Sequence, residues 1–252
     1  MKKVLLVSLL VSCAQPFTSA QEVDVAGNDR LETRLYAVAT EHQGAIPAKE
    51  LLELWKEFPA AQTLQMLMDL RITDTTDSEL RGKMLIALRD TPGVSEDHRA
   101  FATRILAGEL QPLSTRLGHK LSLKFKALDG REVDLAKLRG KVTLIDFWAT
   151  WCGPCVASLP ELKRIYEECH SRGLEIIGIS YDFDRARLED FVRNANVTWP
   201  QYFDGASWDN QIGREFAIRI LPTMGLIDKN GILRSITTSD KVRTEIEKLL
   251  SE

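Results

Sequence analysis

Several features that mark other protein classes are missing from this 252-residue chain. It has no excess of positive charge: the formal net charge is -3 at pH 7, whereas nucleic acids and anionic lipids are bound by basic surfaces. Beyond residue 20 no apolar run approaches the ~20 residues of a membrane-spanning helix. Internal repeats and low-complexity tracts are absent from the sequence. With 44% apolar and 27% charged residues, the chain has a globular composition, and nucleic acid is not an expected partner.

Cysteine is also scarce, with four residues in the whole chain. Only Cys152 and Cys155 have the CxxC spacing, and no second CxxC exists to complete a tetrahedral zinc site. The adjacent Cys169 and His170 would rarely reach one ion together. A purely structural disulfide is disfavoured as well, because a CxxC loop is short and strained. We therefore expect no metal and no cofactor, and the cysteine pair needs another explanation.

The chain is longer than a typical domain of about 100 to 150 residues, so we expect two compact units. The pattern of apolar residues changes after Gln111-Pro112, from helical spacing to alternating strand and helix patterns. We predict a signal peptide at residues 1–20, a helical N-terminal domain at 21–112 and an α/β domain at 113–252.

The first twenty residues have the layout of a secretory signal. Lys2 and Lys3 precede an apolar run over Val4–Val11, and the small residues Thr18–Ala20 provide a cleavage region. An alternative is the stretch Leu10–Cys13, which is similar to a bacterial lipobox with a lipidated cysteine. We favour ordinary cleavage, and either route predicts an exported protein, periplasmic or otherwise extracytoplasmic, with Cys13 as the alternative lipid anchor.

Residues 21–112 show apolar side chains at three- and four-residue steps between proline and glycine, which predicts a bundle of helical hairpins. Asp77 and Ser95 are candidate N-caps. The expected helical segments are Leu31–Ala39, Leu51–Phe58, Thr63–Leu70, Asp77–Arg89 and Ser95–Ala107.

Residues 113–252 alternate strand and helix patterns, which favours a layered α/β sheet. Asp129-Gly130 is a two-residue hairpin turn between apolar–polar alternations. The expected strands are Leu121–Ala127, Glu132–Leu135, Val142–Trp148, Leu174–Tyr181, Met224–Asp228 and Ile232–Ile236. The expected helices are Pro154–Ser171, Arg187–Asn194, Asn210–Phe216 and Asp240–Leu250.

The stretch Leu144–Cys155 carries the chemistry, because a buried strand runs straight into a helix and the two cysteines lie at that junction. A sulfur at a helix N-terminus lies near unpaired N–H groups and the positive end of the helix dipole, which favours the nucleophilic thiolate of Cys152. Cys155 follows one turn later, within reach of a mixed disulfide on Cys152. Pro154 suits the first turn of a helix.

The segment Asp146–Cys155 closely resembles the active-site motif of thioredoxin, and Ile220–Thr223 resembles the cis-proline loop of that fold. The resemblance covers about Leu113–Glu252. Together with the export signal, the hairpin Leu121–Leu135 followed by Leu138–Lys141 is similar to the TlpA/ResA-type periplasmic branch. The resemblance implies a thioredoxin-like fold, in which a central mixed sheet is flanked by helices, joined here to an N-terminal all-α domain.

The resemblance also implies residue roles. Cys152 would be the attacking thiolate, Cys155 the resolving thiol and Asp146 a buried carboxylate that moves a proton to or from Cys155, with a pKa raised by burial. A locally paired strand-end acid is the alternative for Asp146. Pro222 would be cis, with an ordinary trans proline as the alternative. The implied substrate-binding residues are Trp151, Gly153, Pro154, Leu221 and Pro222.

Two positions depart from the ResA-type pattern, which often has a glutamate three residues after the second cysteine and an uncharged residue at the buried strand position. This chain has Ser158 and Asp146 there. These departures argue against a narrow role in cytochrome c maturation.

The remaining cysteine, Cys169, shares one helical face with Leu162, Ile165 and Tyr166, which predicts a buried apolar thiol. His170 is expected to be a solvated residue at the helix end. Packing rather than cofactor contact is expected of Trp55, Trp199 and Trp208.

The dipeptide Gly153-Pro154 is that of thioredoxin, a reductant near roughly -270 mV. We therefore predict a protein-disulfide reductase that acts on exported client proteins and receives electrons from a membrane thiol–disulfide donor. A disulfide oxidase or isomerase is one alternative. Another is a partner-binding protein whose helical domain carries the main function, with an accessory redox domain. A thiol peroxidase is disfavoured, because such enzymes use a lone low-pKa cysteine in a different motif.

Overall fold

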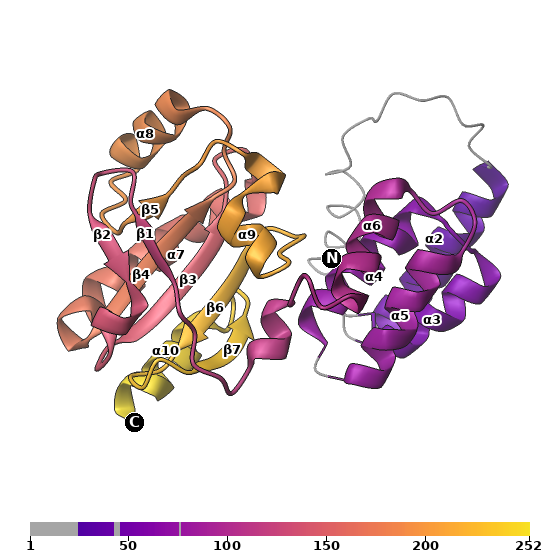
Figure 1. Cartoon of the computed structure of the whole chain (residues 1–252), viewed down its shortest axis with the longest axis horizontal. Helices are drawn as coiled ribbons and strands as arrows, with labels where there is room; N and C mark the ends of the chain where they lie inside the picture. Colours follow the sequence, from indigo (N-terminus) through magenta and orange to yellow (C-terminus); the bar gives the residue numbers. More distant parts are fainter. Residues whose placement is uncertain (1–24, 43–45, 76) are drawn as a thin grey trace. The chain divides into compact units, whose positions relative to one another are not determined.

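The computed structural model describes residues 25–42, 46–75 and 77–252. The chain divides into two compact units, with the division between Glu109 and Leu110. Figure 1 shows the first unit in indigo to magenta and the second in magenta to yellow. The predicted signal peptide and Cys13 lie outside the described residues. Among those residues, no helix is both long and apolar enough to cross a lipid bilayer.

The first unit is helical because its apolar residues recur on one face of each segment. In α3 (Ala48–Glu57), Leu51, Leu54 and Trp55 recur at three- and four-residue spacing on one face and are all buried. The N-caps Asp77 and Ser95 are confirmed: each side chain accepts backbone N–H groups at the start of its helix. The helices are α2 (Val25–Glu41), α3 (Ala48–Glu57), α4 (Gln62–Asp74), α5 (Ser78–Asp90) and α6 (Glu96–Leu106).

The second unit is built on a five-stranded mixed sheet in the order β5-β4-β3-β6-β7. The strands β3, β4 and β5 are parallel, whereas β6 and β7 run antiparallel to their neighbours. All seven residues of the central strand β3 are buried, as an interior strand covered on both faces requires. These strands are β3 (Val142–Trp148), β4 (Leu174–Ser180), β5 (Gln201–Tyr202), β6 (Thr223–Ile227) and β7 (Leu233–Thr237).

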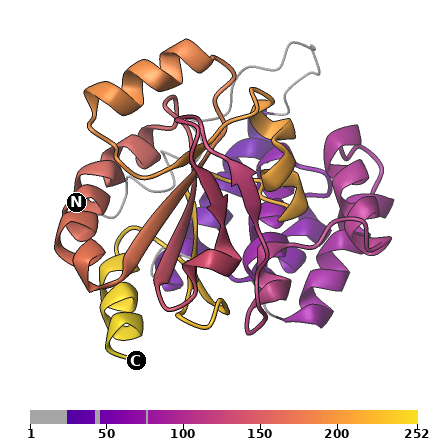
Figure 2. The ribbon, with the colours of Figure 1, turned by 60° about the vertical axis from the view of Figure 1, so that its left-hand side comes forward.

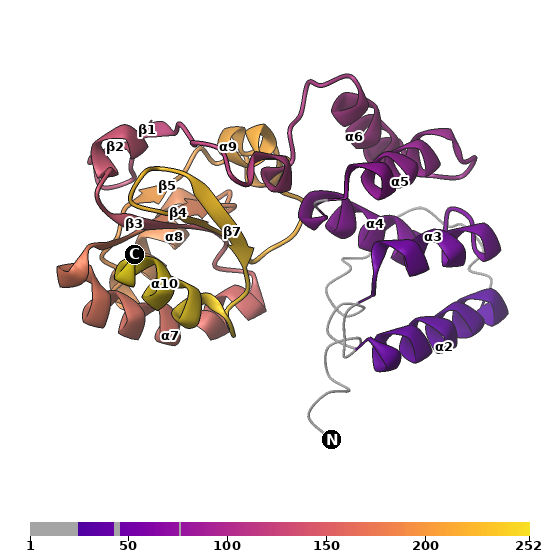
Figure 3. The same cartoon turned by 90° about the horizontal axis from the view of Figure 1, so that it is seen from below.

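Two apolar clusters cover the two faces of this sheet. On one face α7 (Gly153–Cys169) and α10 (Val242–Ser251) pack against alternate residues of β3, including Val142 and Leu144. Ile145 and Phe147 lie on the opposite face. This face is covered by the strands of the β1–β2 hairpin and by residues of α8 and α9. Figures 2 and 3 show α7 and α10 together on one side of the sheet. The covering elements on the other side are β1 (Lys124–Lys126), β2 (Glu132–Asp134), α8 (Arg185–Asn194) and α9 (Gln211–Glu215).

The predicted order of strands and helices in this unit is confirmed, but several bounds differ. Strand pairing in the hairpin is shorter than the sequence alternation predicted, because β1 covers only Lys124–Lys126 and Leu135 already begins a 3-10 turn, Leu135–Leu138. Strand β5 was not predicted, since its two residues are too few to show a period. Helix α7 ends at Cys169, two residues before the predicted end, where a 3-10 turn follows.

Candidate active site

The two motif cysteines lie at the junction of β3 and α7, as predicted. Cys152 is the N-cap of α7 and Pro154 lies in its first turn. The sulfurs of Cys152 and Cys155 form a disulfide, with the two Cα atoms 5.3 Å apart. The backbone N–H of Cys155 donates a hydrogen bond to Cys152 Sγ at 3.3 Å. A donor in this position, at the positive end of a helix, stabilises negative charge on the same sulfur when the disulfide is reduced.

Asp146 lies on β3, six residues before Cys152, and is buried with 5% of its surface exposed. Side chains alternate along a strand, so Asp146 points to the same face as Leu144, which α7 covers. Its antiparallel partner Met224 belongs to the same apolar cluster. Cys155 lies in the first turn of α7. The Cys155 side chain itself belongs to the apolar cluster that contains Ile145 and Phe147.

The environment of Asp146 disfavours its charged form. Its Oδ1 atom has no hydrogen-bond partner among the residues described. Burial raises the pKa of Asp146 from 3.8 to about 7, because the carboxylate loses its hydration and gains no compensating contact. A carboxyl group that titrates near neutral pH can accept or donate a proton under ordinary conditions.

A buried glutamine, which the sequence did not predict, lies beside this acid. Gln201 on β5 accepts a hydrogen bond from Trp148 Nε1 at 2.8 Å and donates one to the carbonyl of Trp199 at 3.2 Å. Its side chain covers Gly178, which is the register partner of Asp146 on β4. A Cβ on Gly178 would lie 2.0 Å from Gln201 Oε1, so any larger residue there would displace this amide and its hydrogen bonds. The Gln201 amide therefore packs against the residue that pairs with Asp146 on the neighbouring strand.

A second buried carboxylate, also missed from the sequence, holds the loop before the cysteines. Asp182 follows β4 and is 2% exposed. Its carboxylate accepts the N–H of Thr150 at 3.1 Å and 3.3 Å and the Thr150 hydroxyl at 2.6 Å. The Ser180 hydroxyl adds a further hydrogen bond at 2.8 Å. Because Thr150 is two residues before Cys152, this carboxylate fixes the approach of the chain to the disulfide.

The Leu221–Pro222 peptide bond is cis, as the resemblance implied. Thr223 begins β6 next, and its register partner is Phe147 near the end of β3. The cis-proline loop and the Cys152 loop therefore start from adjacent positions on neighbouring strands. Within this loop the Thr223 hydroxyl donates to the carbonyl of Ile220 at 2.8 Å.

The tryptophans differ in their surroundings. Trp55 and Trp199 are buried, as packing residues should be. Trp151 is 40% exposed, so it is not a core residue, and Gly153 and Pro154 beside the disulfide are exposed too. Trp208 packs at the surface rather than in the core: it is 46% exposed and its ring centroid lies 5.9 Å from that of Trp151.

The remaining polar positions near α7 have structural explanations. Ser158 is buried and donates to the carbonyl of Cys155 at 2.8 Å. Glu161 pairs with Arg243 at the surface, and this contact lowers the pKa of Glu161.

Cys169 is 1% exposed, which confirms the predicted buried thiol, and its burial raises the pKa of this thiol. His170 is half exposed at the end of α7, as predicted. Within the described parts of the chain, no three His, Cys, Asp or Glu side chains group closely enough to hold a metal ion.

The chain is similar to known thiol–disulfide oxidoreductases. The Redoxin family model matches residues 106–250, more than half of the chain. The thiol-disulfide oxidoreductase ResA of Geobacillus thermodenitrificans is 32% identical over 123 residues, which cover 49% of this chain and 69% of the relative. ResA of Bacillus cereus is 28% identical over 125 residues, or 50% of this chain and 70% of the relative.

Among solved structures, the thioredoxin domain of a thiol-disulfide oxidoreductase from Bacteroides vulgatus matches with a TM-score of 0.48 and 23% identity, covering 53% of this chain and 97% of that domain. The family match and the ResA relatives, together with a disulfide at a CxxC helix start, lead to one conclusion. The chain belongs to the Redoxin family, and its second unit is a thioredoxin-like thiol–disulfide oxidoreductase of the TlpA/ResA type.

Proposed function

We propose that the protein is a protein-disulfide reductase that transfers electrons from Cys152 and Cys155 to disulfides of exported client proteins. The observation that carries the proposal is the position of Cys152 at the N-cap of α7, with its sulfur accepting the N–H of Cys155. The intervening Gly153-Pro154 supports the reducing direction, because thioredoxin with this dipeptide has a potential near roughly -270 mV.

The proposed reaction is two successive exchanges. In the reduced protein the Cys152 thiolate attacks one sulfur of the client disulfide, which forms a mixed disulfide and releases the other client sulfur as a thiolate. The Cys155 thiolate then attacks Cys152 Sγ and releases the second client sulfur. The client gains two electrons, and the protein is left with the Cys152–Cys155 disulfide that the structure contains.

Asp146 is the proposed proton acceptor for Cys155 in the second exchange. Cys155 must lose its proton to become a nucleophile, and a carboxyl group with a pKa of about 7 can take it near neutral pH. When the protein is recharged, the same carboxyl group returns the proton. For client binding we propose Trp151, Gly153 and Pro154 on one side of the sulfur and Leu221 and Pro222 on the other, with the client backbone meeting Leu221 as an added strand.

Trapping tests this assignment. We expect Cys155→Ser to accumulate a mixed disulfide between Cys152 and its client, because the second exchange is blocked. The client is identified by mass spectrometry after non-reducing separation. The control is the double variant Cys152→Ser, Cys155→Ser, which should trap nothing. Equal trapping by Cys152→Ser alone would show that the nucleophile has been assigned to the wrong cysteine.

The direction of electron flow has its own test. We expect a redox titration against glutathione to give a potential well below about -180 mV, the value of protein disulfide isomerase. A reductase also needs a dithiol donor, which we propose to be a membrane thiol–disulfide protein. A potential above that value would favour the oxidase or isomerase alternative.

Location is proposed from residues 1–20, which have the layout of an export signal. We propose cleavage after Ala20, with lipidation of Cys13 as the alternative, and an extracytoplasmic site of action. Intact-mass measurement on the protein purified from its host distinguishes these routes: an unmodified chain that begins at Gln21 supports cleavage, whereas a diacylated Cys13 supports the anchor.

We further propose that residues 21–112 and 113–252 are separate domains and that the helical one docks partners. The Redoxin match begins at residue 106, so nearly all of the helical domain lies outside the catalytic family. We expect two transitions in scanning calorimetry of the full chain, of which only the one from residues 113–252 shifts on reduction of the disulfide. A single transition would contradict this division.

A further inference from the structure

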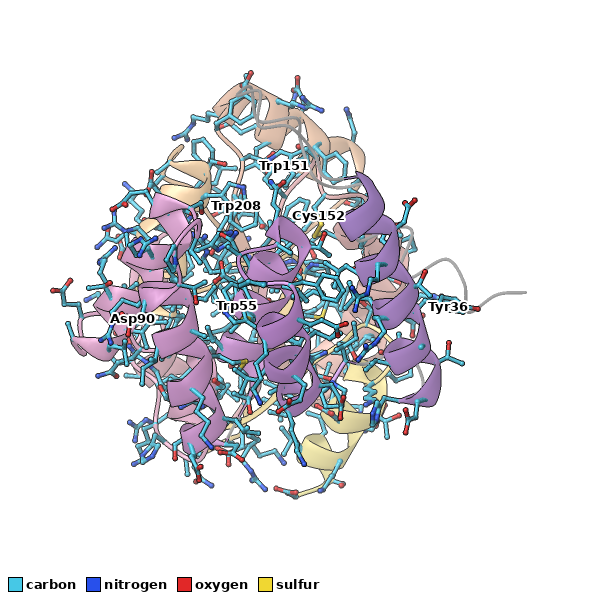
Figure 4. All side chains as sticks on the ribbon, turned by 90° about the vertical axis from the view of Figure 1, so that its right-hand side faces the viewer. Tyr36, Trp55, Asp90, Trp151, Cys152 and Trp208 are labelled. Atoms are coloured by element: carbon cyan, nitrogen blue, oxygen red, sulfur yellow. A yellow bond between two sulfur atoms is a disulfide. The ribbon has the colours of Figure 1, made fainter. Side chains whose placement is uncertain are left out.

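Two tryptophans form an exposed aromatic pair beside the disulfide. Trp151 immediately precedes Cys152 and is 40% exposed, and Trp208 is 46% exposed. Their ring centroids are 5.9 Å apart with the planes tilted by 56°. Figure 4 labels both tryptophans and Cys152. Adjacent exposed aromatic side chains on a folded surface mark an interaction site more often than isolated ones do.

The Trp208 ring packs against a buried tyrosine. Tyr181, which is fully buried, meets it edge to face with centroids 5.3 Å apart. The Tyr181 hydroxyl in turn covers Gly213, where a Cβ would lie 1.8 Å from the oxygen. Glycine at this position lets the tyrosine reach its site under Trp208. The Trp208 ring is therefore held in place by its contact with Tyr181, although one side of it is exposed.

Hydrogen bonds fix the loop that carries Trp208. Asp204 accepts the N–H groups of Ala206 and Gln211 at 3.0 and 2.8 Å. Asn210, which has no exposed surface, donates to the carbonyl of Ser180 at 2.9 Å and accepts the N–H of Gly213 at 2.8 Å. A ring held in this way loses little conformational entropy when a ligand covers it.

The two tryptophan loops share one buried anchor. The Ser180 hydroxyl bonds to Asp182, whose carboxylate holds Thr150 next to Trp151. The Ser180 carbonyl bonds to Asn210, two residues after Trp208. The end of β4 thus sets the position of both rings relative to each other and to Cys152.

We propose that Trp151 and Trp208 form a preorganised site for an aromatic side chain of the client, two residues from the client cysteine. This inference rests on the proposed function and names its substrate class. The client sulfur must meet Cys152, and side chains two residues apart in an extended chain point to the same face, about 6.6 Å apart, so the residue two positions from the client cysteine can reach the rings.

An aromatic occupant fits better than a cationic one, because Asp204 is engaged by hydrogen bonds from its own loop. Asp209 is 85% exposed with Arg214 3.8 Å away, and an ion pair with so exposed a carboxylate contributes little. The two tryptophans provide aromatic ring surface for a client side chain. Aromatic rings pack on such surface in offset or edge-to-face arrangements.

The test compares disulfide-linked peptide dimers that differ only in the residue two positions from cysteine: Phe, Ala or Arg. Stopped-flow rates with the reduced full-length protein should favour the Phe peptide over the Ala peptide by about three- to tenfold, the range expected of one aromatic pair. Trp208→Ala should bring this ratio close to one, and Trp208→Phe should keep most of it. Tyr36→Ala removes an exposed ring from the helical unit and should change neither the rates nor the ratio.

Each other outcome is decisive. A preference for the Arg peptide, a uniform loss for all peptides in Trp208→Ala, or a ratio that Trp208→Ala leaves unchanged would overturn the aromatic site while the reductase proposal stands. If the wild-type protein reduces none of the peptides, the reductase proposal fails and the site fails with it. Near-UV circular dichroism and thermal unfolding check that the variants fold, and Trp208→Phe keeps the test valid if Trp208→Ala does not.

Discussion

Asp146 and Asp182 are two buried acids at neighbouring strands of one sheet, and they have opposite surroundings. They are 5% and 2% exposed, so burial hardly distinguishes them. Asp182 is surrounded by donors from Thr150 and Ser180. Asp146 Oδ1 has no donor within the part of the chain that the structure describes, and its pKa is raised to about 7.

The two acids differ in the number of hydrogen-bond donors around the carboxylate and not in how far they are buried. The number of donors therefore separates an acid that stabilises the structure from one that can transfer a proton. A carboxylate with several donors is a stable anchor for the chain around it. A carboxyl group without them exchanges its proton near neutral pH and destabilises the fold when ionised. One sheet therefore supports both the position of the active-site loop and the proposed proton transfer.

The largest expected effect is on stability and comes from Asp146→Asn. As pH rises, the unfolded chain loses this proton near pH 3.8 and the folded chain near pH 7, so the wild type loses stability between these values. The loss approaches on the order of 4 kcal/mol above pH 8, because one pKa unit corresponds to about 1.4 kcal/mol. The oxidised variant should therefore be more stable than the wild type at pH 9 by this amount and nearly equal at pH 4.

Urea unfolding of both oxidised proteins at a series of pH values measures this difference. Any hydrogen-bonding cost of the asparagine amide shifts the variant equally at every pH, so the pH dependence of the difference is the diagnostic quantity. A constant difference from pH 4 to pH 9 would show that the pKa of Asp146 in the folded protein is not raised above its value in the unfolded chain, and the contrast with Asp182 would disappear.

The next effect is kinetic and uses the same variant. General base catalysis contributes about 100-fold or more, so Asp146→Asn should slow the release of the second client thiol by about that factor at pH 7. In the wild type this rate should rise as pH increases through about 7, where Asp146 loses its proton. The variant should lack this rise. Rapid-quench measurement with a disulfide peptide separates this step from the first exchange, whose rate Asp146→Asn should leave within a few-fold.

Asp182→Asn should act in the opposite direction on stability. The substitution replaces an acceptor oxygen by an NH₂ group and leaves a buried donor of Thr150 or Ser180 without its partner, at a cost of about 1 to 3 kcal/mol. Thr150→Val removes only the hydroxyl and should cost less. Chemical unfolding at pH 7 measures both. If Asp182→Asn were as stable as the wild type, the network around Asp182 would not anchor the loop.

The contrast between the two acids also explains what the sequence could predict. Asp146 belongs to a continuous motif that ends in Cys155, so its site could be predicted from adjacent residues. Asp182 contacts Thr150 across 32 positions, and the contact depends on the register Trp148–Ser180 of two parallel strands. No local pattern encodes that register, so the acid gave no signal of its function.

The fold shows the same division between local and distant information. The long buried strand β3 and the N-capped helices of the first unit were predicted from their own residues. Gln201 beside Asp146 and the surface pairing of Trp151 with Trp208 depend on strands and loops that meet only in the folded chain. The sheet extends into β5 by only two residues, too few for a periodic signal.

The smallest effect extends the contrast to an exposed carboxylate. Asp77 accepts the N–H groups of Glu79 and Leu80 at 3.0 Å, but water can replace it. Asp77→Ala should therefore cost only about 1 kcal/mol, as for other N-caps, and less than the buried Asp182→Asn. Native-state hydrogen exchange should show faster exchange at Glu79 and Leu80 and unchanged protection in β3. If the cost equalled or exceeded that of Asp182→Asn, the number of hydrogen bonds alone would decide a carboxylate's contribution, and burial would add nothing.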